Sequence, residues 1–151
     1  MVIYNGAMKK FFVFLIGVTL LFSCEKDEAI SNVPQISFES ISPTTAQEYE
    51  DEIIITISYF DEDGDLGEND PNVKNLFLTD NRNNITYEFR IQQLSPDNST
   101  ITIEGNLDIS LSSTGITDSS NSQIVTFDIY VVDRANHQSN IVTSNPITII
   151  K

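Results

Sequence analysis

The feature that most constrains this 151-residue chain is the alternation of apolar and polar side chains along most of its length after residue 34. Successive side chains of a β-strand point to opposite faces of a sheet, so this alternation predicts strands with one buried and one solvated face. No window beyond residue 34 has the period of an amphipathic helix. The pattern predicts seven strands, at residues 36–38, 53–59, 76–78, 85–91, 101–111, 125–131 and 147–149.

Turn-forming residues separate these runs, among them "DNRNN" at 80–84, "SPDNS" at 95–99 and "SSTGITDSSNS" at 112–122. Short strands joined by such turns predict an all-β fold. We expect residues 35–151 to form one seven-stranded antiparallel immunoglobulin-like β-sandwich. Cys24 is the single cysteine, so no disulfide is available to stabilise this domain.

The segment "MKKFFVFLIGVTLLFSC" at 8–24 has two lysines, then an apolar run, then a serine and a cysteine. This order is typical of a secretory signal peptide, and the apolar run is shorter than the roughly 17–25 residues of a membrane-spanning helix. We expect residues 1–23 to be the signal peptide, with Met8 as the true start. "LFSC" resembles the lipobox of bacterial lipoproteins, which implies that Cys24 is lipidated and begins the mature chain. The alternative is a buried free cysteine after a core helix.

Residues 24–34 are polar and acidic, and they predict a tether between the lipidated cysteine and the domain. The acidic "EKDE" at 25–28 resembles the signal that exports some Gram-negative lipoproteins to the cell surface. Several acyl chains hold a protein durably on a membrane. We therefore expect a lipid-anchored outer-membrane protein that is exposed at the cell surface and has the membrane as a partner through its anchor. The alternative is that the acidic residues form only a solvated linker.

The formal net charge of −14 restricts the partners of this chain. An acidic protein is repelled by phosphate backbones, so we exclude nucleic acid as the default partner. Clustered carboxylates instead favour divalent cations.

The densest acidic stretch is "DEDGDLGEND" at 61–70, directly after a predicted strand. Asp61, Asp63 and Asp65 occupy every second position, and oxygen ligands at this spacing in a glycine-containing loop suit Ca²⁺. The loop is not an EF-hand, because the sixth and twelfth positions counted from Asp61 are leucine and asparagine.

The acidic loop joins the second and third predicted strands. In a seven-stranded sandwich this loop and the loop between the sixth and seventh strands emerge at the same end of the fold. Asp133 and Asn136 follow the sixth predicted strand, so we expect them to approach the acidic loop. The candidate calcium ligands are therefore Asp61, Asp63, Asp65, Asp133 and Asn136. A bound ion would stiffen the joint with the tether, which leaves from the same end. The alternative is that these side chains cap their own turns and need no metal.

Three segments, "PQISFESISP", "DEIIITISYFDEDGDLG" and "FDIYVVDRANHQSN", resemble Ig-like domains of Gram-negative bacterial surface lipoproteins. In those domains a strand end Y-x-D-x-D-G-D-x-G is paired with a later turn D-x-A-G-N-x-S-N. Asn136 stands here where that turn usually has glycine, and His137 stands where asparagine follows. The resemblance implies a fold and a location, and no established activity.

Catalytic motifs are not evident in the sequence. His137 is the single histidine and lies in a polar turn, and no G-x-S-x-G segment occurs. We expect a binding or adhesion module, not an enzyme, with a glycan or a protein as its ligand. The alternative is a structural accessory subunit of an outer-membrane assembly. Phe60, Phe77 and Tyr130 fall on the solvent side of their predicted strands, and three rings on one exposed face would favour binding.

Overall fold

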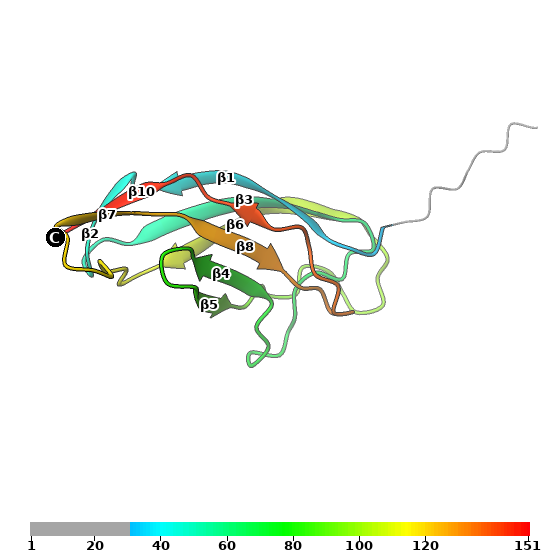
Figure 1. Ribbon diagram of the computed structural model, residues 1–151. Helices are drawn as coiled ribbons and strands as arrows, with labels where there is room; N and C mark the ends of the chain where they lie inside the picture. Colours follow the sequence, from blue (N-terminus) through cyan, green and yellow to red (C-terminus); the bar gives the residue numbers. More distant parts are fainter. Residues whose placement is uncertain (1–30) are drawn as a thin grey trace, which may run out of the picture.

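The computed structural model describes residues 31–151, which form an all-β fold (Figure 1). The strands are β1 (Gln35–Ser42), β2 (Thr45–Gln47), β3 (Ile53–Asp61), β4 (Leu76–Asp80), β5 (Ile85–Phe89), β6 (Ile103–Leu111), β7 (Ser122–Val125), β8 (Phe127–Val131), β9 (Val142–Thr143) and β10 (Ile147–Ile150). A search of the described residues for a helix of membrane-crossing length and hydrophobicity finds none. The expected signal peptide and Cys24 lie outside the described residues.

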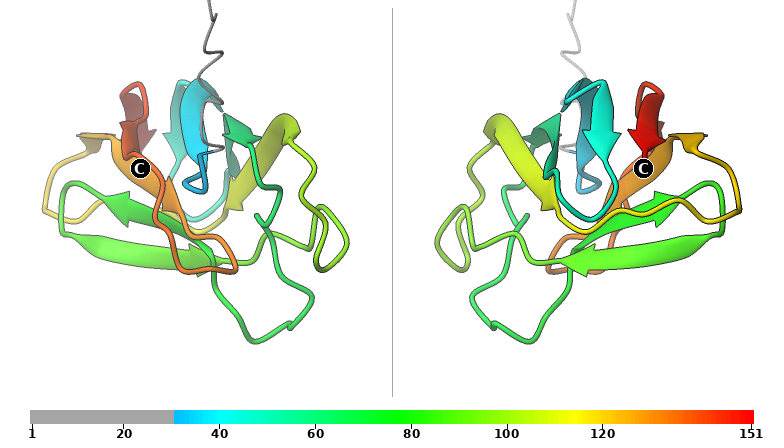
Figure 2. Two further views of the ribbon diagram at one scale, coloured as in Figure 1. Left: turned by 90° about the vertical axis from the view of Figure 1, so that its right-hand side faces the viewer. Right: turned by 90° about the vertical axis from the view of Figure 1, so that its left-hand side faces the viewer.

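The strands are arranged as a β-sandwich, as the alternation predicted. One layer is the sheet β1-β3-β6, and the facing layer is the sheet β5-β4-β8-β9. Figure 2 shows β4 and β5 on one side of the molecule and β1 on the other. A third sheet, β2-β10-β7, lies toward the end that carries the C-terminus (Figure 1). It continues the second layer, because one residue alone, Thr126, separates β7 from β8.

The strand count is ten, so the expectation of seven strands is wrong. β2 and β9 are additional strands of three and two residues, too short to show an alternating pattern in the sequence. The sixth expected strand is divided at Thr126, because β7 pairs with β10 whereas β8 pairs with β4 and β9. The arrangement is also not wholly antiparallel. Pro43 has no amide hydrogen with which to continue β1, and the chain after it forms β2 parallel to β10.

The hydrophobic core lies between the two layers and is built from the inward-facing residues of the strands. Ile53, Ile55 and Ile57 of β3 and Phe127 and Ile129 of β8 are each fully buried. Burial of one such side chain contributes about 1.5–3 kcal/mol to stability. The sequence alternation therefore assigned the buried face of these two strands correctly.

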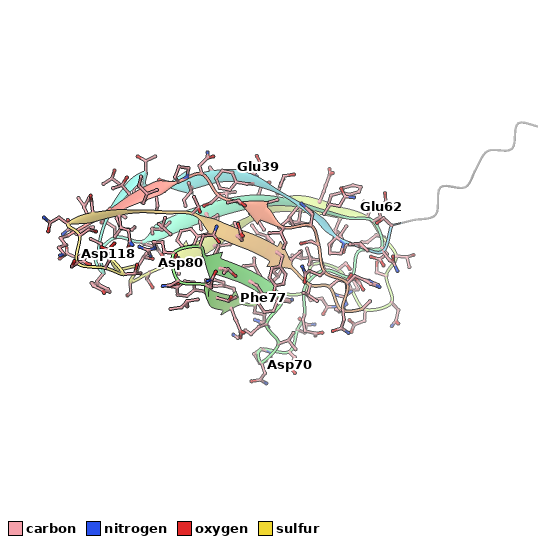
Figure 3. All side chains as sticks on the ribbon, in the orientation of Figure 1. Glu39, Glu62, Asp70, Phe77, Asp80 and Asp118 are labelled. Atoms are coloured by element: carbon pink, nitrogen blue, oxygen red, sulfur yellow. The ribbon has the colours of Figure 1, made fainter. Side chains whose placement is uncertain are left out.

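The three off-core aromatic rings do not share one face. Phe77 and Tyr130 stack on the outer side of the second layer, with ring centroids 4.8 Å apart and 14° between their planes. Phe60 belongs to β3 in the other layer and is 40% exposed. Figure 3 shows Phe77 and Glu39 of β1 on opposite sides of the sandwich. The expected condition of three rings on one face is not met.

The core-facing side of three strands ends in a buried aspartate. Asp61 closes β3 and Asp80 closes β4, and both are fully buried. Asp133 lies two residues beyond β8 on the same side and is 6% exposed. A buried carboxylate is stable only with a counter-charge or with hydrogen bonds. The three aspartates differ in the partners that the fold supplies.

Asp80 is neutralised by Arg82 in the turn between β4 and β5. The Arg82 Nη2 atom lies 2.6 Å from Asp80 Oδ2, and the Arg82 side chain is 8% exposed. Arg82 Nη1 also donates to the Gly115 carbonyl at 3.0 Å and to Gln123 Oε1 at 2.9 Å. Arg82 therefore attaches the β4–β5 hairpin to the loop before β7 and to β7 itself.

We predict that Arg82→Met lowers the free energy of unfolding by about 3–5 kcal/mol, because the variant leaves Asp80 as an unpaired buried charge. Urea denaturation measures the change. Lys74→Met, at an exposed position, is the control and should stay within about 0.5 kcal/mol of the parent. Equal losses in the two variants would contradict the assigned role of Arg82.

Candidate metal site

The acidic loop after β3 and the turn after β8 meet at one end of the sandwich. The Arg134 amide donates to the Asp65 carbonyl at 3.2 Å, and the Val132 amide donates to the Asn75 carbonyl at 2.9 Å. The first described residues lie at the same end, where the Ser31 amide donates to the Glu62 carboxylate. Figure 3 labels Glu62 at this end. We call this end of the molecule the acidic pole and define it by residues 61–67 and 133–137.

The local fold of the acidic loop is set by Leu66. Its side chain is fully buried in the hydrophobic core, although the five residues before it are all acidic or glycine. Its backbone amide donates to Asp61 Oδ2 at 2.8 Å. Because Leu66 is drawn into the core, the loop curves back on itself and the carboxylates of positions 61, 63 and 65 are brought together.

Two glycines allow this curvature. Gly64 and Gly67 have φ angles of +71° and +90°, a region that side-chain-bearing residues rarely adopt. A Cβ atom at Gly64 would lie 2.0 Å from the Ile101 carbonyl oxygen, and one at Gly67 would lie 2.2 Å from the Gln92 carbonyl oxygen. The loop is therefore pressed against the connection between β5 and β6, where only glycine fits at these two positions.

Arg134 holds the loop from the opposite segment. Its Nη1 donates to the Gly67 carbonyl at 2.9 Å, and its Nη2 lies 3.5 Å from the Gly64 carbonyl. The guanidinium thus binds backbone oxygens, and it forms no ion pair with an aspartate in the part of the chain that the structure describes. Arg134 thus shapes the acidic loop through its backbone, and its positive charge offsets part of the rise in the pKa of Asp65.

Asp61, Asp63 and Asp65 form one cluster. One carboxylate oxygen of each lies within 4.8 Å of those of the other two. The Oδ1 atoms of all three are buried and accept no hydrogen bond. Buried polar atoms in native proteins almost always have a partner, so three buried oxygens without one, on three clustered carboxylates, need an explanation. A cation between them would be the missing partner.

The other two predicted ligands lie nearby but outside this cluster. The Asp133 carboxylate accepts the His137 amide at 2.8 Å, and its Oδ2 lies 3.0 Å from His137 Nδ1. Asn136 is exposed and has a φ angle of +68°, the conformation that glycine favours. The structure thus brings Asp61, Asp63 and Asp65 together, gives Asp133 a partner of its own and leaves the Asn136 side chain on the surface.

The electrostatics of the acidic pole disfavour a metal-free ionised state. The pKa of Asp61 is raised from 3.8 to about 6, chiefly by burial. The hydrogen bond from the Leu66 amide opposes this rise, and the neighbouring carboxylates of Asp63 and Asp65 contribute to it. Burial also raises the pKa of Asp65, with the Asp133 carboxylate as the next cause. At neutral pH the metal-free loop therefore holds several negative charges that repel one another.

The donor set suits calcium. Ca²⁺ binds six to eight oxygen atoms at about 2.3–2.6 Å, so two of its ligands on opposite sides lie about 5 Å apart. One carboxylate oxygen from each of Asp61, Asp63 and Asp65 falls within this span. Mg²⁺ needs shorter distances and a stricter octahedron. Asp61, Asp63 and Asp65 would hold the ion, with backbone oxygens or water completing its coordination.

Comparison of the chain with family models, curated proteins and solved structures returns no match.

Sequence reasoning missed the residues that shape the site. Leu66 counted only as a departure from the EF-hand pattern, although an apolar residue inside an acidic loop is a signal for a buried anchor. Arg134 and Ser95, whose hydroxyl donates to the Gly64 carbonyl, carry no such signal. Their contacts with the loop span more than 30 residues along the chain, and a sequence pattern does not record them.

We predict that the metal-free protein loses stability as the pH rises from about 4 to 7. Because the pKa of Asp61 is raised to about 6 in the fold, the folded state binds its proton more tightly than the unfolded state. This stabilisation is complete below the unfolded pKa of 3.8 and is lost as the pH passes through about 6. The loss amounts to at most about 3 kcal/mol.

Thermal unfolding of metal-stripped protein across this pH range measures the effect. Asp61→Asn keeps an oxygen for the Leu66 amide and removes the titrating group, so its melting temperature should fall less over the same range. Parallel pH profiles for the parent and the variant would contradict the prediction.

Proposed function

We propose that this chain is a lipid-anchored, surface-exposed and non-catalytic binding module whose sandwich is stabilised by one calcium ion. The observation that supports the calcium site is the set of three buried carboxylate oxygens without hydrogen-bond partners at the acidic pole. Asp80 and Asp133 occupy equivalent strand ends and have Arg82 and His137 beside them. Asp61 has only other acids and one backbone amide, so an external cation is the partner that its environment lacks.

The strand order supports an immunoglobulin-like module. The sheets β1-β3-β6 and β5-β4-β8-β9 correspond to the A-B-E and C′-C-F-G sheets of immunoglobulin-type sandwiches. Such sandwiches gather their loops at two ends, and loops on a rigid scaffold commonly carry binding functions. This correspondence agrees with the resemblance to Ig-like domains of Gram-negative surface lipoproteins.

The lipid anchor is supported by the sequence around Cys24. The lipobox-like "LFSC" follows an apolar run and precedes the acidic "EKDE". The domain begins at the acidic pole, where Ser31 contacts Glu62, so the calcium site would lie at the joint between tether and domain. A bound ion would then hold the domain at a more defined orientation to the membrane surface.

A second candidate is a structural accessory subunit of an outer-membrane assembly. Ile85, Ile101, Ile124 and Ile141 are each more than half exposed, which is unusual for isoleucine. Co-purification of a stoichiometric protein partner from solubilised membranes would favour this alternative over the binding module.

We predict that calcium raises the melting temperature of the metal-stripped protein. An ion at about 100 times its Kd stabilises the folded state by about 2.7 kcal/mol, and magnesium at the same concentration should stabilise it less. Differential scanning calorimetry measures both shifts. Asp63→Asn should abolish most of the calcium shift.

Asp70→Asn is the matched control, because Asp70 lies on the same loop but is exposed and caps its own turn through Asn72. This variant should keep the full calcium shift. No shift in the parent protein, or the same loss in Asp70→Asn and Asp63→Asn, would refute the site.

We predict that Cys24→Ser abolishes lipidation and releases the protein from membranes. Metabolic labelling with an alkyne fatty acid, followed by membrane fractionation, reports both effects. Protease treatment of intact cells should degrade the parent protein if it faces the outside. Membrane retention of the unlabelled variant would contradict the assignment of the anchor.

A further inference from the structure

A groove of about 890 Å³ crosses the outer side of the sheet β1-β3-β6 near the acidic pole. Two rows of residues in cross-strand register lie along it. Gln35 of β1 pairs with Phe60 of β3, which pairs with Glu104 of β6. In the next row of outward-facing residues, Ser37 pairs with Ser58, which pairs with Asn106. We call these six residues the sheet groove.

Phe60 gives the sheet groove an apolar surface. It lies on the central strand of the sheet and is 40% exposed, whereas its neighbour Asp61 on the opposite side of the strand is fully buried. An aromatic ring presents a flat apolar face that packs against other flat apolar surfaces. The carbon–hydrogen face of a sugar ring is such a surface.

The other residues of the sheet groove offer neutral hydrogen-bonding groups. Gln35 and Asn106 each carry amide donors and an acceptor, and the hydroxyl groups of Ser37 and Ser58 both donate and accept. These short serine side chains lie beside the longer side chain of Phe60, which leaves room over the second row. An aromatic surface beside several neutral polar groups is the usual composition of a small-ligand site.

The charge of the sheet groove selects against anionic ligands. Among residues 31–151, Glu104 is the one charged residue that lines the groove, and no lysine or arginine of this range lines it. Phosphate, sulfate and uronate groups would have no cationic partner there and would be repelled by Glu104. A ligand rich in uncharged hydroxyl groups can hydrogen-bond to the polar lining and is not repelled by Glu104.

The second layer offers a weaker alternative. Phe77 and Tyr130 are stacked on each other, so much of their ring surface is already covered. The threonines beside them are also engaged, since Thr79 and Thr86 share a hydrogen bond of 2.9 Å and Thr143 donates to Asp128 at 2.7 Å. The outer side of the β1-β3-β6 sheet therefore has more ring surface and more hydrogen-bonding side chains available to a ligand.

We propose that the sheet groove binds a neutral glycan chain. One sugar ring lies on Phe60, and its hydroxyl groups hydrogen-bond to Gln35, Ser58 and Asn106. This assignment rests on the proposed binding function and names its class of ligand. The groove and the calcium site share the end of β3, because Phe60 faces the glycan and Asp61 faces the ion.

The test uses the full mature chain in detergent micelles and three uncharged probes, namely cellohexaose, xylohexaose and mannohexaose, with hexagalacturonate as the anionic comparison. Isothermal titration should detect binding of at least one neutral hexasaccharide and weaker or undetectable binding of hexagalacturonate. Phe60→Ala should weaken that binding by about tenfold or more, because the ring surface is lost. Asn106→Ala, at an exposed position, should weaken it by a few-fold.

Phe77→Ala is the matched aromatic control on the other layer and should leave the affinity within about twofold. Each variant is first checked for the melting temperature of the parent protein. Failure of all three neutral probes to bind, a preference for hexagalacturonate, or a loss in Phe77→Ala but not in Phe60→Ala would overturn the proposal.

The calcium shift of the melting temperature, measured on the same Phe60→Ala protein, separates this proposal from the proposed calcium site. The variant should keep the full shift, since Asp61, Asp63 and Asp65 are unchanged. A protein that responds to calcium but binds no glycan refutes the groove alone. A protein that binds a neutral glycan through Phe60 but ignores calcium refutes the metal site alone.

Discussion

The constraint on which this structure depends is the burial of a carboxylate at the end of its central strand. Ile53, Ile55 and Ile57 of β3 face the core, and continuing the same alternation places Asp61 on that side with no exposed surface. Removing a carboxylate from water is strongly unfavourable unless a charge or several hydrogen bonds replace the water. The acidic loop, curved by the burial of Leu66, supplies the Leu66 amide to this group and places Asp63 and Asp65 beside it.

The three buried aspartates differ in their partners, and this difference supports the candidate metal site. Asp80 is balanced by the guanidinium of Arg82, and Asp133 is bound by the amide and the ring of His137. Asp61 is surrounded by further acids, and its one counterpart is the Leu66 amide. Two of these aspartates therefore have a partner within the chain, whereas Asp61 has no counter-charge among the described residues. This difference is the physical reason for proposing a cation beside Asp61 and not beside Asp80 or Asp133.

The acidic pole also connects features that are separate in the sequence. The segment 133–137 meets the acidic loop through Arg134, and the domain's first described residues contact it through Glu62. Nearby, the side chain of Asn140 accepts from the Ile36 amide and donates to its carbonyl, which ties the beginning of β1 to the chain after β8. An ion at this pole would thus act on the tether joint, on the loops and on the strand end that carries Phe60.

The amino-acid sequence by itself determined the all-β class, the buried sides of β3 and β8 and the acidic loop as a candidate site. These properties depend on neighbouring residues in the chain, because alternation along a strand decides which side chains face the core. Only the tertiary structure decided the division of the sixth expected strand at Thr126, the burial of Leu66 and the separate partners of Asp61, Asp80 and Asp133. Each of these depends on contacts between distant segments, such as Arg134 with Gly67 or Arg82 with Gln123. A local pattern cannot encode such contacts, since they arise from the way in which the two layers pack.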